Sequence, residues 1–187
     1  MQQIKWFERK FNFDNSHLVF PSILERLEGA PLRLEHKITR ISEEILQKHL
    51  KNTWSIKENV GHLIDLEPLW QGRLQDILEG KEELRPTDLA NGATFLANHN
   101  NTSTSVLIEK FYSIRQKTLD LLSNINASEL ERFGLHPRLK TPMRICDIFL
   151  FVAEHDDHHL ARMTEIIKIC DHLATDRNSC LRPNYQI

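Results

Sequence analysis

The sequence predicts an all-α protein folded as a four-helix bundle. Four long stretches place apolar residues three or four positions apart, which is the spacing of one face of an α-helix. None of the four shows the strict alternation of apolar and polar residues that a half-buried strand would show. Because only 6 glycines and 7 prolines interrupt the 187 residues, the helices can be long, and four amphipathic helices without strands are typical of a bundle.

The first helix is expected over about residues 21–50, with a kink near Pro31, because proline has no backbone N–H to donate. The second is expected from Ser55 to about Glu79. Ser55 is a suitable N-cap, and Glu58 three residues later completes a capping box. The apolar face of the first helix consists of Leu34, Ile38, Ile41, Ile45 and Leu46.

The stretch 85–103 is rich in Asn, Thr, Gly and Ser and is expected to be irregular. The third helix should begin near Ser103 or Thr104. The last helix should begin at Thr141-Pro142, an N-cap followed by proline at the first helical position, and run to about His172. The apolar face of the third helix consists of Val106, Leu107, Phe111, Ile114, Leu119 and Leu122.

Length and composition favour a single globular domain over residues 1–187, with a core at about 20–172, a short N-terminal extension and a C-terminal tail. The formal net charge is −2 and no basic stripe stands out, so we expect no nucleic-acid partner. No run of 18 apolar residues and no signal-peptide core occur, so we expect neither a membrane span nor secretion. Three cysteines without a CxxC spacing are interpreted as reduced thiols of a cytoplasmic protein.

Histidines interrupt the apolar stripe of the last helix. His155 and His159 stand where the pattern calls for Ile or Leu, four residues apart on one face. One inward histidine is usually satisfied within the core, but two neutral imidazoles would need separate partners and two charged ones would repel each other. A divalent cation removes both difficulties. The stripe consists of Ile145, Ile148, Val152, His155, His159, Met163 (or Arg162) and Ile166.

A third ligand is predicted from the second helix. His62 shares a face with Leu66 and Leu69, so its side chain can point inward, and Gly61 before it allows a close approach by another helix. Taken alone, His62 would be interpreted as an ordinary helical histidine. Together with the pair on the last helix, it completes a predicted three-histidine metal site.

The neighbours of these histidines allow more than one interpretation. His158 could also reach a metal ion, but the stripe selects His159 and places His158 at an edge. Asp156, Asp157 and Glu67 are expected in solvent, with hydrogen bonding to a ligand imidazole as the alternative for each. Glu67 could also act as a general base. Trp54 and Trp70 are expected to pack in the core or at a helix end, and Cys146 to be a buried thiol rather than a nucleophile. Arg73 could meet an anionic substrate, or Arg73 and Arg115 could both be exposed. The stretch 92–100, with His99, could cover the mouth of the site or be a connection without a role.

The chain resembles the DinB/YfiT-like superfamily of four-helix bundles. The resemblance covers about residues 20–170 and rests on three segments, WSIKENVGHLIDLE at 54–67, FYSIRQKTLDLL at 111–122 and FVAEHDDHHLARM at 151–163. It implies a divalent metal ion, often zinc or nickel, among His62, His155 and His159. It also implies a homodimer and one of two activities, thiol-dependent transfer (with bacillithiol, for example) or metal-dependent hydrolysis. The Thr/Asn-rich stretch at 94–104 departs from the family pattern.

Three functional hypotheses follow from these residues. The first is an enzyme acting on a small molecule, with the metal ion activating either a water or a thiol cosubstrate; no catalytic residue is assigned. The second is a metal-stabilised bundle without turnover, and a substrate cavity beside the histidines would argue against it. The third is a helical interaction module in which the histidines are incidental. Motifs of the GxSxG, P-loop and Rossmann types are absent from the sequence.

Overall fold

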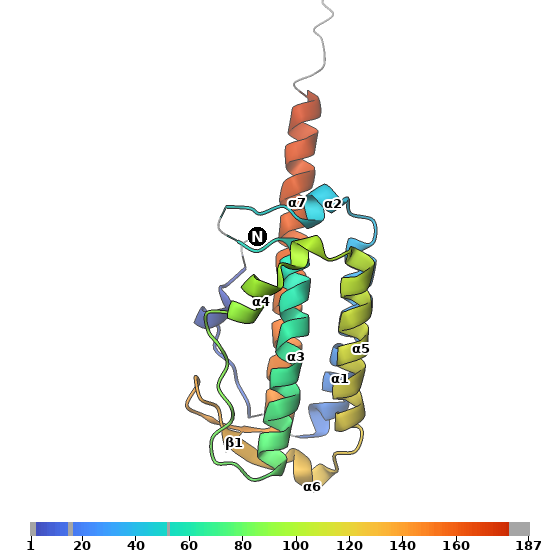
Figure 1. Cartoon of the computed structure of the whole chain (residues 1–187). Coiled ribbons are helices and arrows are strands. Elements are labelled where there is room, and N and C mark those ends of the chain that lie inside the picture. The colour runs from blue at the N-terminus through green and yellow to red at the C-terminus, as the bar shows by residue number, and fades with distance from the viewer. Residues whose placement is uncertain (1–2, 15–16, 52, 180–187) are drawn as a thin grey trace, which may run out of the picture.

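The computed structural model describes residues 3–14, 17–51 and 53–179, and within them four long helices form a bundle (Figure 1). Helix α3 packs against α5 and α7, and α1 packs against the same two helices, so the contacts run in a ring. The predicted four-helix bundle is confirmed. The four helices are α1 (Phe20–Ile38), α3 (Ile56–Leu78), α5 (Thr104–Leu122) and α7 (Ile145–Ser179).

Short elements connect and flank these helices. Strands β1 and β2 form an antiparallel hairpin in which Gly134 lies opposite Met143. The N-terminal segment, α4 and the hairpin gather on one side of the bundle, at the left of Figure 1. The short elements are η1 (Trp6–Glu8), η2 (His17–Val19), α2 (Glu43–Leu46), α4 (Gly92–Ala97), η3 (His99–Asn101), α6 (Ala127–Leu130), β1 (Phe133–Leu135) and β2 (Pro142–Arg144).

The caps of two long helices confirm the predicted starts. The Ser55 hydroxyl accepts the backbone N–H of Glu58 at 3.1 Å, and the Glu58 carboxylate accepts that of Ser55 at 2.7 Å. This is the reciprocal capping box expected for α3. Ser103 caps α5 by accepting the backbone N–H of Val106.

The predicted extent of the first helix was wrong. Helix α1 ends at Ile38, and a separate turn, α2, begins after Ser42. The backbone of Ser42 is extended, with φ −65° and ψ 147°, which breaks the helical path. The apolar spacing continues through this break, because α2 also turns an apolar face, including the buried Leu46, toward the bundle.

The predicted start of the last helix was also wrong. Pro142 lies in β2, and α7 begins at Ile145. Asp147, in the first turn, accepts the backbone N–H of Arg144 at 3.0 Å, so an acid inside the helix makes the contact that Thr141 was expected to make. Helix α7 continues past His172 to Ser179, and residues 180–187 of the expected tail lie outside the described residues.

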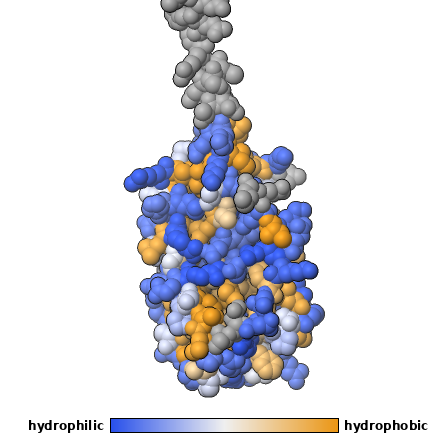
Figure 2. Space-filling view, turned by 180° about the vertical axis from the view of Figure 1, so that it is seen from behind, coloured by the Kyte–Doolittle hydropathy of each residue, from blue (hydrophilic) through white to orange (hydrophobic). Residues whose placement is uncertain are grey.

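A polar layer divides the buried interior into two apolar clusters. On α7, the buried apolar residues between Ile145 and Ala153 belong to one cluster, and Leu160, Met163, Ile166 and Cys170 belong to the other. Between them lie the buried polar residues His155, Asp156 and His159. The face opposite to that of Figure 1 mixes hydrophilic and hydrophobic side chains (Figure 2).

Candidate metal centre

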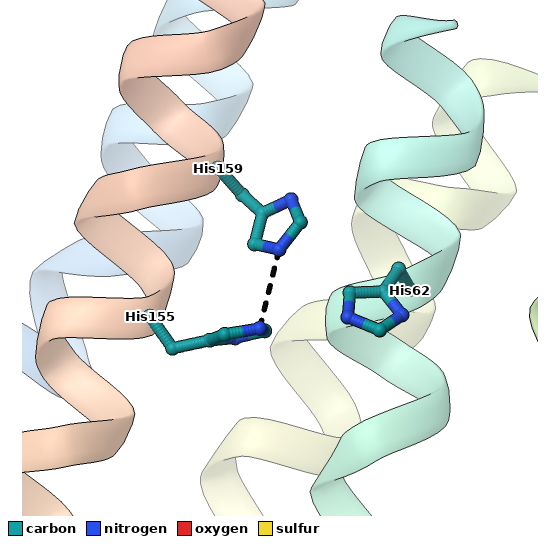
Figure 3. Close-up of side chains that lie close together, drawn as sticks. All are labelled: His62, His155 and His159. Carbon is teal, nitrogen blue, oxygen red and sulfur yellow. Dashed lines mark hydrogen bonds between the residues drawn. The ribbon is translucent and has the colours of Figure 1, made fainter. Parts of the chain in front are cut away.

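Three imidazoles from two neighbouring helices point toward one another (Figure 3). His62 comes from α3, and His155 and His159 come from consecutive turns of α7. One ring nitrogen of each lies within 4.8 Å of the others, and all three residues are buried. The Nε2 atoms of His155 and His159 are 3.2 Å apart, close to the separation of about 3.3 Å that two nitrogens have on a tetrahedral ion with metal–nitrogen bonds of about 2.05 Å.

The proton of His159 is positioned by Asn59. The Asn59 side-chain nitrogen donates to the backbone carbonyl of Ser55 at 2.7 Å, so its Oδ1 faces His159 Nδ1 at 2.8 Å. An amide oxygen only accepts, so Nδ1 of His159 must carry the proton. Its Nε2 is left with a free lone pair that points toward the other two rings.

A parallel arrangement positions the proton of His62. The Thr94 hydroxyl donates to Asp65 Oδ2 at 2.9 Å, so its oxygen accepts from Nδ1 of His62 at 3.2 Å. His99 Nε2 lies 2.9 Å from the same Asp65 oxygen. The stretch 92–100, expected to be irregular, therefore folds as α4 and η3 over this histidine.

Gly61 is required for this packing. A Cβ at this position would lie 2.1 Å from the ring of His99. The close approach expected at Gly61 thus occurs, but a side chain from η3 makes it rather than a long helix.

His155 differs from the other two histidines. Its Nδ1 is buried and has no hydrogen-bond partner among the residues that the structure describes. The ring lies against Trp6, with ring centroids 4.9 Å apart, and against Trp70 at 5.9 Å. Since Nε2 of His159 lacks a proton, the 3.2 Å contact between the two rings has His155 as the donor.

All three imidazoles are neutral at pH 7. Burial lowers the pKa of His62 to about 4, although the charge of Asp65 opposes the shift. Burial lowers the pKa values of His155 and His159 well below 6.5, and the repulsion between two protonated rings so close together lowers them further. A metal ion requires the unprotonated nitrogen. The donor set and the spacing fit a divalent ion, and His62 and His159 already present an unprotonated Nε2, whereas His155 would give up its Nε2 proton on binding.

A cavity of about 170 Å³ adjoins the three histidines, and all three contribute to its wall. Aromatic side chains make much of its surface: Trp6, Phe7, Trp54, Trp70 and Phe151. They come from the N-terminal segment, from the residues just before α3, from α3 itself and from α7. His158 also lines the cavity, and its ring packs against Trp6 with centroids 5.4 Å apart.

The expectation that Glu67 and Asp156 lie in solvent was wrong. Their exposures are 0% and 1%. Arg115, itself buried, donates to Glu67 Oε1 at 2.5 Å and to Asp156 Oδ2 at 2.6 Å, and it also bonds the carbonyl of Leu27. Neither acid has a hydrogen bond to a candidate ligand histidine in the described part of the chain.

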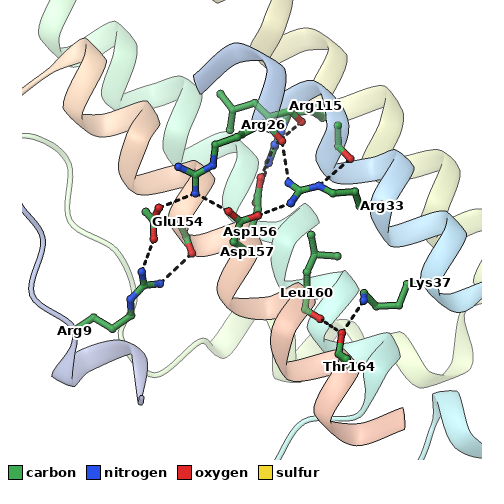
Figure 4. Close-up of polar contacts among 12 residues, drawn as sticks. Arg9, Arg26, Arg33, Lys37, Arg115, Glu154, Asp156, Asp157, Leu160 and Thr164 are labelled. Atoms are coloured by element: carbon green, nitrogen blue, oxygen red, sulfur yellow. Dashed lines mark hydrogen bonds and ion pairs between the residues drawn. The ribbon is translucent and has the colours of Figure 1, made fainter. Parts of the chain in front are cut away.

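Asp157 is half-buried and lies on the outer side of α7. Arg26 and Arg33 of α1 donate to it at 2.5 and 2.6 Å, and Arg26 also bonds Glu154 (Figure 4). Arg9 reaches Glu154 as well, which attaches the N-terminal segment to α7. These ion pairs hold in place the segment whose Trp6 and Phe7 line the cavity.

Cys146 is buried, and burial raises the pKa of its thiol to about 11, as expected of a structural cysteine. Cys146 and Cys170 are both free thiols, while Cys180 lies outside the described residues. Over the described ranges, no helix combines the length and apolar character needed to cross a membrane.

Comparison with known proteins places the chain in context. The family model described as the DinB superfamily matches residues 26–163, which include all three histidines. The search of the curated proteins found no match.

Similar solved structures support the same fold. YfiT from Bacillus subtilis, described as a probable metal-dependent hydrolase with an unusual four-helix bundle topology, matches with a TM-score of 0.77 and 19% identity over 88% of this chain and 94% of its own. A protein from Streptococcus pneumoniae matches with a TM-score of 0.62 and 12% identity, covering 86% and 93%. The colibactin self-resistance protein ClbS, solved with double-stranded DNA, matches with a TM-score of 0.57 and 16% identity, covering 79% and 95%.

Proposed function

Since the chain belongs to the DinB superfamily, we propose that it is a metal-dependent enzyme whose divalent ion is held by His62, His155 and His159. One observation carries the proposal: three buried, neutral imidazoles converge at the wall of a cavity lined by aromatic side chains. Zinc and nickel are the proposed ions, because both accept imidazole ligands.

Three protein ligands leave a coordination position open, as in catalytic sites. A divalent ion held by the three histidines would lower the pKa of a water or a thiol bound at the open position, and would so supply a hydroxide or a thiolate as nucleophile. The first route is hydrolysis and the second is transfer from a low-molecular-weight thiol such as bacillithiol. The cavity beside the histidines favours either route over a metal site that serves stability alone, which would not need space for a small molecule.

The surrounding residues have defined roles in this proposal. Asn59 and Thr94 hold the Nδ1 protons of His159 and His62, which keeps each Nε2 available as a ligand. Trp6 and Trp54 cover two sides of the histidine cluster and limit the access of bulk water. The small-molecule substrate would lie in the cavity, and the protein would act in the cytoplasm as a homodimer.

The first test is metal content, measured by elemental mass spectrometry on purified protein. We expect about one zinc or nickel per chain in the wild type and a loss of at least tenfold in His155→Ala/His159→Ala, because two of the three ligands are removed. His36→Ala is the matched control, since this histidine is exposed on α1, and it should retain the metal. A wild type that takes up no zinc or nickel on incubation would contradict the proposal.

The two enzymatic routes differ in what they consume. The metal-loaded protein would be assayed on activated esters and amides, and on electrophilic substrates with and without an added thiol. Turnover that requires the thiol identifies the transferase, whereas turnover without it identifies the hydrolase. A metal-loaded protein inactive in both assays would instead favour the metal-stabilised bundle. Sedimentation analysis tests the proposed homodimer.

A further inference from the structure

Arg73 is a buried cation in the wall of the cavity. Its exposure is 1%, and it extends from α3 past the ring of Trp70, 5.4 Å from the guanidinium carbon. Its Nε donates to the backbone carbonyl of Arg85 at 3.1 Å. Its Nη2 is buried and has no hydrogen-bond partner among the described residues, which leaves an unsatisfied donor in the cavity wall.

Arg138, from the loop of the β1–β2 hairpin, is a second cation of the same cavity. Its guanidinium lies over the ring of Phe7 at 5.1 Å, and its Nη2 is likewise buried without a partner in the described part of the chain. The two positive charges act on each other: burial and the charge of Arg138 lower the pKa of Arg73 to about 10.

No carboxylate in the described ranges forms an ion pair with either arginine. Asp76, whose negative charge does act on Arg73, is itself bonded to Arg85 and Lys81 at 2.8 Å. A buried cation without an anionic partner is costly to hold in a folded protein. A ligand that brings negative charge would remove this cost.

His136 adds to the surplus of donors. Its Nδ1 faces the backbone N–H groups of Arg138 and Leu139 at 3.2 Å, and its Nε2 faces Nη1 of Arg73 at 3.0 Å. Burial and the two arginine charges lower its pKa to about 3, so the ring is neutral. A neutral imidazole has one accepting nitrogen, so in either tautomer at least one of these donors lacks an acceptor.

We propose that Arg73 and Arg138 form an anion-binding subsite that takes the oxyanion, carboxylate or phosphate, of a small molecule with an apolar body. The unpartnered Nη2 atoms supply the donors, since guanidinium groups bind both oxyanions through paired N–H bonds. The apolar body lies against the aromatic wall. Trp70 contacts both ends, 5.4 Å from Arg73 and 5.9 Å from the ring of His155, which places the other end of the molecule at the histidines.

The substrate class rests on the proposed function, but the anion subsite does not require a metal ion. The test is therefore calorimetric titration of chelator-treated, metal-free protein at pH 7.5 with 3-phenylpropionate, phenyl phosphate and the neutral 3-phenylpropanol. We expect at least one anion to bind at least about tenfold more tightly than the alcohol. Whichever anion binds more tightly identifies the oxyanion.

Variants locate the binding. Arg138→Gln should weaken anion binding at least about tenfold, and it should fold, because Arg138 is only half-buried and its Nη2 makes no hydrogen bond in the described structure. Arg73→Lys should also weaken binding, because lysine keeps the charge but loses the planar fork. Arg40→Gln removes the same charge from an exposed position and should leave binding unchanged.

Equal affinity for the anions and the alcohol, or equal loss in Arg40→Gln and Arg138→Gln, would overturn the subsite. The result is separable from the metal proposal, because His155→Ala/His159→Ala should still bind the anion. Binding of zinc without binding of the anion would contradict only the subsite. Binding of the anion without binding of a metal would contradict only the proposed function.

Discussion

At the scale of single residues, the orientation of each candidate ligand depends on a neutral hydrogen-bond partner. Asn59 accepts the Nδ1 proton of His159 at 2.8 Å, and its own amide is oriented by the carbonyl of Ser55. The sequence shows Asn59 only as a polar residue three positions before His62. Its role depends on the packing of α3 against α7, so no local pattern predicts it.

Asn59→Ala should weaken metal binding about 10- to 100-fold while leaving all three histidines in place. Without the acceptor, the proton of His159 is free to move to Nε2, where it would block the ligand lone pair. Competition titration with a chromophoric zinc chelator measures the change. Asn124→Ala is the control, because this exposed residue donates to the nearby backbone carbonyl of Asp120. Equal affinities in both variants would contradict the role of Asn59.

His136 predicts a pH dependence of stability. In the unfolded chain it takes up a proton near pH 6.5, whereas in the folded protein the pKa is about 3. Between these values the unfolded state binds more protons, so the free energy of unfolding falls as the pH falls. The stabilisation is complete above pH 6.5 and is lost toward pH 3.

The contribution of His136 is isolated by comparing metal-free wild type with His136→Gln in urea unfolding from pH 7 to pH 4. The wild-type slope should be steeper by up to about 1.4 kcal/mol per pH unit. Other buried histidines, such as His62, contribute to the slope in both proteins and cancel in the comparison. Parallel slopes would show that His136 is not protected from protonation by the fold.

At the scale of elements, α4 and η3 are stabilised by their contacts with α3. Their stretch contains Asn, Thr and Gly and has little helical periodicity, which is why an irregular segment was expected. The structure adds contacts with α3 that the local pattern does not contain: Thr94 with His62, and His99 with Asp65. Asn91 and Asn98 lie in the left-handed region, with φ of 55° and 49°, and delimit α4.

Gly61→Ala should destabilise the protein by about 1–3 kcal/mol, because the new Cβ would lie 2.1 Å from the ring of His99 and displace it from Asp65. Gly29→Ala is a matched helical control. Its Cβ would have its nearest neighbour, in the side chain of Arg33, at 3.9 Å, so it should stabilise the protein by about 0.5–1 kcal/mol. Denaturant unfolding measures the change in the free energy of unfolding for both variants. Changes of the same sign would contradict the close packing of His99 against Gly61.

At the scale of the whole molecule, Arg115 ties the four long helices together across the polar layer. From α5 it bonds Glu67 on α3, Asp156 on α7 and the carbonyl of Leu27 on α1. Burial raises the pKa of both carboxyl groups, against the attraction of the guanidinium. The layer lies between the two apolar clusters, so it defines how the helices align along their axes.

Arg115→Met should destabilise the bundle by about 3–5 kcal/mol, because it leaves two buried carboxyl groups without their cation. Adding Glu67→Gln and Asp156→Asn should recover part of this loss by removing the uncompensated charge. Thermal and urea unfolding measure the series. A cost below about 1 kcal/mol for the single change, within the range of a surface ion pair, would show that the cluster is not a structural centre.

Local interactions account for what the sequence alone determined. The Ser55–Glu58 capping box, the Ser103 cap and the spacing of apolar residues on α3, α5 and α7 all involve neighbours within a few positions. They therefore predicted the bundle and the inward direction of His155 and His159. The break after Ile38 and the start of α7 at Ile145 were missed because an apolar spacing can continue across a turn and because Asp147, not Thr141, makes the cap.

Only the tertiary structure decided which polar residues are buried and with what partners. Arg115 is 48 positions from Glu67 and 41 from Asp156, and Arg73 is 63 positions from His136. A charged residue looks the same in sequence whether it faces water or a distant counterion, because burial is settled by helix packing. The convergence of His62 with the pair on α7 was predicted from the sequence. The positions of the imidazole protons, the cavity beside the histidines and the two arginines in its wall depend on contacts that only helix packing creates.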